Sequence, residues 1–111
     1  MPIVRIDYEK EHVSEDNVRK LVQAIQISAA DVTGYDPEEI SVFASANQIT
    51  ANAAPLEIYI YATFPDVSED DMESMLEKLS FLILDFKKEN DIKIPFNLSV
   101  VKMNWKFKIA V

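Results

Sequence analysis

The chain of 111 residues contains no cysteine, one glycine and one histidine, and each scarcity excludes a class of site. Without cysteine there is no thiol nucleophile, no disulfide and no thiolate-ligated zinc or iron–sulfur centre. Gly34 alone cannot supply the glycines that a Walker phosphate loop or a dinucleotide fingerprint requires. A single histidine, His12, excludes the paired-histidine helix of zinc metalloproteases. We therefore expect no cofactor and no metal site.

Acidic residues dominate the charge, because 19 Asp plus Glu against 11 Lys plus Arg give a formal net charge of −8. A protein that follows a phosphate backbone needs a basic stripe, and no segment of this sequence provides one. We therefore expect no nucleic-acid partner. The sequence has no apolar run of about 18 residues and no signal-peptide pattern. These absences predict no membrane partner and make the cytoplasm the default location.

Four segments are rich in β-branched and aromatic residues and are predicted to be β-strands: 2–8, 39–46, 56–64 and 96–101. The length of the chain fits one domain, residues 1–111. Hydrophobic residues make up 49% of the sequence, which is typical of a globular protein with a packed core.

Two segments with apolar residues at helical spacing lie between these strands. Ser14 and Ser68 each precede acidic side chains, the pattern of a helix N-cap, and Ser68 with Asp71 approximates a capping box. Gly34 can adopt a positive φ and is predicted to end the first helix. The predicted buried faces are Val18, Leu21, Val22, Ile25, Ala29 and Val32 in the first helix, and Met72, Met75, Leu76, Leu79, Ile83 and Phe86 in the second.

The tetrapeptide Val-Ser-Glu-Asp occurs at residues 13–16 and again at 67–70, about half a chain apart. The same offset places apolar positions of the first predicted helix on apolar positions of the second. We interpret the chain as two copies of one βαβ unit, about 1–54 and 55–111. Because a βαβ crossover joins parallel strands, the predicted fold is α+β with the order βαββαβ, a four-stranded mixed sheet with two helices on one face. A ferredoxin-like domain has the same element order but interleaves the strands of its halves, so strand order discriminates the two.

The sheet face opposite the helices is predicted to mix aromatic and polar side chains. Alternation along the strands places there Ile3, Phe43, Tyr59, Tyr61 and Val101, together with Arg5, Asp7, Ser41, Ser45, Glu57 and Asn97. Aromatic enrichment favours a subunit interface, the alternative being a half-exposed sheet. Residues 101–111 alternate between apolar and polar and predict a long extra strand that pairs at a sheet edge.

Three short motifs accompany the duplicated unit: Pro-Ile-Val-Arg-Ile at residues 2–6, Thr-Gly-x-x-Pro-x-x-Ile-x-Val at 33–42, and Met103-Asn104. Together they resemble the tautomerase superfamily. Its short members, such as 4-oxalocrotonate tautomerase, are single βαβ units, and its long members, such as macrophage migration inhibitory factor, are fused pairs that assemble as trimers. The resemblance covers most of the chain and implies a homotrimer.

The resemblance also implies a catalytic role for Pro2. Removal of Met1 would give Pro2 an N-terminal secondary amine, and the pKa of such an amine lies near neutrality and falls further on burial. A base of this kind can move a proton alpha to a carbonyl, so the implied reaction is keto–enol tautomerisation of a small α-keto or enol substrate. The alternative is a chemically idle proline, and retention of Met1 would leave its nitrogen an amide.

Further positions follow from the same resemblance. Phe64 matches an apolar position of the substrate pocket, and Asn97 falls where long members bind substrate through a tyrosine. Lys10, with His12 beside it, occupies the stretch where short members hold a carboxylate with an arginine. His12 also lies among glutamates in a polar turn, where an exposed histidine needs no function. Tyr35 replaces a lysine of the long members, and the arginine of the short members is missing from residues 9–12. The alternative function is therefore a non-catalytic oligomeric binding or structural protein on the same scaffold, or a ferredoxin-like binding module.

Overall fold

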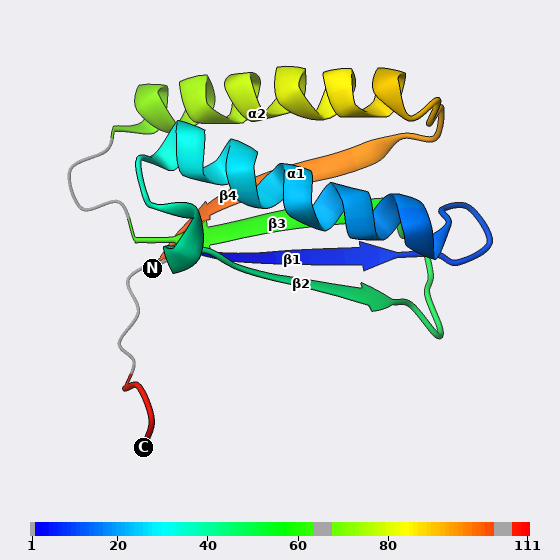
Figure 1. Cartoon of the computed structure of the whole chain (residues 1–111), viewed down its shortest axis with the longest axis horizontal. Coiled ribbons are helices and arrows are strands. Elements are labelled where there is room, and N and C mark those ends of the chain that lie inside the picture. Colours follow the sequence, from blue (N-terminus) through cyan, green and yellow to red (C-terminus); the bar gives the residue numbers. More distant parts are fainter. Residues whose placement is uncertain (1, 64–67, 104–107) are drawn as a thin grey trace.

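The computed structural model describes residues 2–63, 68–103 and 108–111. Two helices lie side by side on one face of a four-stranded sheet (Figure 1). The elements in chain order are β1 (Ile3–Tyr8), α1 (Glu15–Thr33), the short 3-10 helix η1 (Pro37–Glu39), β2 (Ser41–Ala46), β3 (Leu56–Ala62), α2 (Glu69–Glu89) and β4 (Phe96–Lys102). Within the described residues, no helix is long and apolar enough to cross a membrane.

The strand order of the sheet is β2-β1-β3-β4. β1 pairs in parallel with β2, and β3 pairs in parallel with β4, so the two strands of each βαβ unit are neighbours. The antiparallel pairing of β1 with β3 joins the two units. This order confirms the predicted βαββαβ sheet, because a ferredoxin-like domain would interleave the strands of its two halves.

Local signals set the starts of both helices and the end of α1 as the sequence predicts. The Ser14 hydroxyl accepts a hydrogen bond from the backbone N–H of Asn17 at 3.1 Å, which satisfies one of the unpaired donors at the start of α1. Ser68 and Asp71 form a reciprocal capping box at the start of α2. Gly34 ends α1 in the left-handed conformation, with φ 80° and its N–H bonded to the carbonyl of Ala30.

The core lies between the helices and the sheet. On the sheet side, alternate residues of the two central strands are almost completely buried: Val4, Ile6, Leu56, Ile58 and Ile60. The predicted buried face of α1 is confirmed by Val18, Leu21, Ile25 and Ala29, with Val22 and Val32 half-buried. On α2, the residues Leu79, Ile83 and Phe86 are buried, whereas Met72, Met75 and Leu76 are half-buried.

Among the described residues, the strand predicted over 101–111 is present only as far as Lys102. β4 ends at Lys102, and the described residues 103 and 108–111 belong to no strand. Residues 108–111 lie away from the sheet and are exposed (Figure 1). Met103 still donates a backbone hydrogen bond of 2.9 Å to the carbonyl of Ala62 in β3, and a longer strand would need a further backbone to accept its hydrogen bonds. Residues 104–107 lie outside the described residues.

Candidate functional site

The sheet face opposite the helices carries a hollow of about 500 Å³. Its walls come from β1, β2, β3 and the residue that follows β4: Ile3, Arg5, Phe43, Ser45, Tyr61 and Met103. These side chains share one face because alternate residues of a strand point the same way. Most of the wall is apolar or aromatic, and Arg5 is its one charged residue. Apolar walls with a few polar groups are typical of sites for small ligands.

The strand register fixes the neighbours of Arg5 on this face. Arg5 lies between Phe43 of β2 and Tyr59 of β3, and Ile3 lies one step nearer the start of β1, beside Tyr61. Tyr59 and Tyr61 stack, with their ring centroids 6.2 Å apart. The hollow is therefore assembled from residues that are far apart in sequence but adjacent in the sheet.

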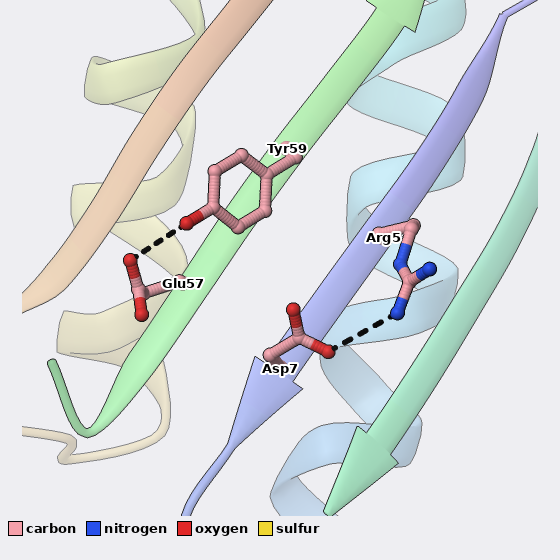
Figure 2. Close-up of polar contacts among 4 residues, drawn as sticks. All are labelled: Arg5, Asp7, Glu57 and Tyr59. Atoms are coloured by element: carbon pink, nitrogen blue, oxygen red, sulfur yellow. Dashed lines mark hydrogen bonds and ion pairs between the residues drawn. The ribbon is translucent and has the colours of Figure 1, made fainter. Parts of the chain in front are cut away.

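Two polar contacts run along neighbouring strands beside the hollow (Figure 2). On β1, the guanidinium of Arg5 lies 3.7 Å from a carboxylate oxygen of Asp7. On β3, the phenol of Tyr59 donates a 2.8 Å hydrogen bond to the carboxylate of Glu57. Asp7 is in register with Glu57, so two carboxylates lie opposite each other on adjacent strands. Like charges in that position repel, and the contacts with Arg5 and Tyr59 offset the repulsion.

The hydrogen bond to Glu57 raises the pKa of Tyr59 above its ordinary value of 10.0, and burial and the negative charges nearby add to the effect. Since the unfolded side chain ionises at the lower pH, its contribution to stability is present below pH 10 and is lost as the pH rises through the folded pKa. We expect an absorbance titration of the tyrosines to contain a component, from Tyr59, that ionises at higher pH than the others. The component should disappear in Tyr59→Phe and move to lower pH in Glu57→Gln, whereas the exposed Glu77→Gln should leave it unchanged. A Glu57→Gln titration identical to wild type would contradict this account.

Pro2 lies directly before β1, and its side chain is fully buried. Its carbonyl accepts a hydrogen bond of 3.3 Å from the backbone N–H of Ser41, which fixes the start of β1 against β2. The next residue, Ile3, lines the hollow. Pro2 therefore lies at the end of the sheet where the apolar part of the hollow is found.

The other predicted site residues lie elsewhere. Lys10 is exposed in the turn after β1 and lines a separate polar pocket with Glu9, Glu11, Asn47, Gln48 and Thr50. Asn97 is exposed on β4, in register with Glu57. Since β1 spans about 20 Å, both residues lie at the end of the sheet remote from Pro2. One chain by itself does not bring Pro2, Lys10 and Asn97 together, and Phe64 lies outside the described residues.

Two residues weighed for chemistry have structural partners. The imidazole of His12 lies 3.3 Å from the carboxylate of Glu9 in an exposed turn. The hydroxyl of Tyr35 donates to the carbonyl of Thr63 at 3.4 Å, which ties the segment after α1 to the end of β3. Among the described residues, no group of three histidine or acidic side chains converges as a metal site.

Arg5 lines the hollow, although no motif of the sequence predicts a role for it. Alternation along the strands predicts Arg5 on the open face together with Phe43 and Tyr61, and the register confirms that placement. Its association with the hollow follows from the order of the strands, because β2 and β3 lie on either side of β1. Alternation within a single strand cannot reveal which residues of other strands stand beside it.

No family model and no curated protein matches this sequence. Solved structures are similar over almost the whole chain. A fused 4-oxalocrotonate tautomerase, described as a wild-type asymmetric trimer, has a TM-score of 0.69 at 13% identity and covers 97% of this chain and 92% of its own. A malonate semialdehyde decarboxylase inhibited by 3-bromopropiolate has a TM-score of 0.67 at 12% identity. The similarity covers 98% of this chain and 91% of that one.

A domain of unknown function from Sebaldella termitidis is similar to the same extent, with a TM-score of 0.68 at 9% identity over 100% of this chain and 98% of that one. At such low identities the similarity concerns the arrangement of the elements. The chain therefore has the fold of the tautomerase superfamily, in agreement with the resemblance inferred from the sequence motifs.

Proposed function

We propose that the protein is a tautomerase-like enzyme that moves a proton on a small α-keto or enol substrate, with Pro2 as the base. The observation that carries the proposal is the position of Pro2, which is buried at the start of β1 directly before a residue of the hollow. The tautomerase-superfamily fold supports it. The proposal requires removal of Met1, because only then is the nitrogen of Pro2 an amine.

The chemistry follows from the nature of that amine. The pKa of an N-terminal amine is about 8, and an apolar environment disfavours the charged form, so part of the population is the free base near neutral pH. The free base can remove a proton from the carbon alpha to a carbonyl and return it to another atom of the resulting enolate. A positioned acid–base group of this kind contributes roughly 10²–10⁴-fold to a rate.

The direct test combines intact mass with an activity assay. The mass of untagged protein reports whether Met1 has been removed, and the enol of phenylpyruvate reports ketonisation by its loss of absorbance. The similar malonate semialdehyde decarboxylase is inhibited by 3-bromopropiolate, an electrophile that an amine can attack. We expect this reagent to label Pro2 and to stop the reaction. Retained Met1, or ketonisation no faster than in buffer, would refute the proposal.

We further propose that the protein is a homotrimer. The open face presents aromatic side chains, Phe43 is 57% exposed on β2, and β2 and β4 are the two edges of the described sheet. The fused 4-oxalocrotonate tautomerase to which the chain is similar is a trimer. A head-to-tail contact between edges is heterologous and closes into a ring. In such a ring, Lys10, Phe64 and Asn97 would bind substrate by joining the Pro2 of a neighbouring subunit.

Light scattering tests the trimer, and we expect a mass about three times the 12.7 kDa of one chain. The substitution Phe43→Asp should shift the mass toward the monomer, since it places a charge in the contact. Phe81→Asp is the matched control, because Phe81 is 63% exposed but lies on α2, away from the open face. A wild-type mass near 12.7 kDa at micromolar concentration would contradict the trimer.

The separation of Lys10 and Asn97 from Pro2 within one chain favours a second candidate, an oligomeric binding or structural protein without catalysis. The two candidates differ in one result. A trimer that keeps Met1, or that does not accelerate ketonisation, would support the binding protein.

A further inference from the structure

We propose that the outer face of α2 is a second interaction surface, on which another copy of the chain docks with its own α2 running antiparallel. The surface, called here the α2 stripe, consists of Glu77, Phe81, Leu84 and Lys88. These residues follow one another at intervals of three or four positions and so share one face of the helix. The inference is independent of the proposed function, because the helices and the hollow lie on opposite faces of the sheet (Figure 1).

The first argument is that the middle of α2 is apolar around its whole circumference. Every residue from 79 to 86 is apolar except Ser80 and Asp85. The side chains that face the core are Leu79, Ile83 and Phe86. On the outer side, Phe81 is 63% exposed and Leu84 is 47% exposed. A helix that is apolar all round is typically buried on all sides, and adjacent exposed apolar side chains mark interaction surfaces.

The second argument is the contrast with α1, which packs on the same sheet. Counted from the N-cap serines, Leu84 corresponds to Ala30 of α1, which is buried, and Lys88 corresponds to Gly34, which ends that helix. α1 therefore has no counterpart of the α2 stripe. Since α1 covers the sheet without these residues, packing within the chain does not account for them.

The third argument is the charge at the two ends of the α2 stripe. Glu77 and Lys88 are exposed, and within the described residues neither makes an ion pair. A two-fold axis midway between Phe81 and Leu84 would place each Phe81 beside Leu84 of the other copy. Glu77 and Lys88 are equally far from that midpoint, so each Glu77 would meet Lys88 of the other copy. The antiparallel contact is thus complementary to itself, as an isologous interface must be.

The size of the surface sets the strength of the contact. One face of one helix is smaller than the interface of a stable dimer, so the association is weak. We expect it at protein concentrations above the micromolar range in which the trimer is tested. At micromolar concentration Phe81→Asp therefore remains a valid control for the contact through Phe43.

The experiment is sedimentation equilibrium of the purified protein from about 10 μM to about 1 mM, the range in which a weak contact is populated. Low ionic strength keeps the exposed charges least screened. We expect the weight-average mass of the wild type to rise with concentration. Glu77→Lys and Lys88→Glu should each abolish the rise, because each substitution brings like charges together at both ends of the contact.

An equal mixture of these two variants tests the antiparallel register. We expect the mixture to regain the rise of the wild type, because each chain of one variant then meets opposite charges on a chain of the other. A parallel contact, or association through apolar surface alone, gives no such recovery. A mixture that associates no more than its separate components would overturn the proposal.

Phe81→Asp should also abolish the rise, since it places a charge in the centre of the contact. Ile27→Asp is the matched control, because Ile27 is 65% exposed but lies on α1, and it should keep the rise. Melting temperatures near that of the wild type show that each variant is folded. A wild-type mass that stays constant up to about 1 mM, or a rise that Phe81→Asp leaves intact, would equally overturn the proposal.

Discussion

Pro2→Ala is expected to slow the ketonisation of phenylpyruvate by about 100-fold or more, the contribution of a positioned general base. The substitution replaces a secondary amine held at the start of β1 by a primary amine that can rotate and lie elsewhere. The rate is followed through the absorbance of the enol, with the intact mass showing that Met1 has been removed from both proteins.

The melting temperature separates chemistry from folding in this comparison. The hydrogen bond from Ser41 to the carbonyl of residue 2 involves only backbone atoms and is kept. Because alanine lacks two buried ring carbons of Pro2, we expect a lower melting temperature but a fully folded protein at the temperature of the assay. Pro95→Ala, at an exposed position before β4, is the matched control and should keep the wild-type rate. Equal rates for the wild type and Pro2→Ala would end the case for Pro2 as the base.

Ile25→Ala is expected to lower the free energy of unfolding by about 2–5 kcal/mol. The side chain of Ile25 is 1% exposed on the face of α1 that covers the sheet. Truncation removes three buried carbon atoms and leaves a cavity that the surrounding core fills only in part. Urea denaturation, with the slope of the transition checked against the wild type, measures the loss.

The same helix supplies the control two residues further on. Ile27 is 65% exposed, so Ile27→Ala removes little buried surface and gains from the higher helix propensity of alanine. We expect a change within about 0.5 kcal/mol. If Ile27→Ala lowered the free energy of unfolding as much as Ile25→Ala, the outer side of α1 would be covered in solution, which would contradict the exposed position of Ile27.

The sequence predicted the helices well because their ends depend on local chemistry. Ser14, Ser68 and Gly34 act through hydrogen bonds to residues a few positions away, and such signals are complete within the sequence of the helix itself. Alternation likewise identified the open face. Strand order followed from the two βαβ units, since each crossover places its own strands side by side.

The remaining features depend on contacts between distant segments. The alternating residues after Val101 predict a strand, but β4 ends at Lys102, and a longer strand would need a further backbone to pair with. Lys10 and Asn97 were grouped with Pro2 through the resemblance, and only the register shows that they lie at the other end of the sheet. Arg5 became a site residue for the same reason, because β2 and β3 bring Phe43 and Tyr61 beside it.

The single antiparallel ladder between β1 and β3 has a consequence for folding. Within the described sheet, the other two ladders each join strands of one βαβ unit, and the link between the units is the exposed loop 47–55, in which Ile49 is 95% exposed. Each half can therefore form its parallel strand pair independently of the other half. The first strand pairs to form in folding then close shorter loops of the chain. A cut in this loop would leave two fragments whose reassociation is bimolecular, so recovery of the native sheet would depend on protein concentration.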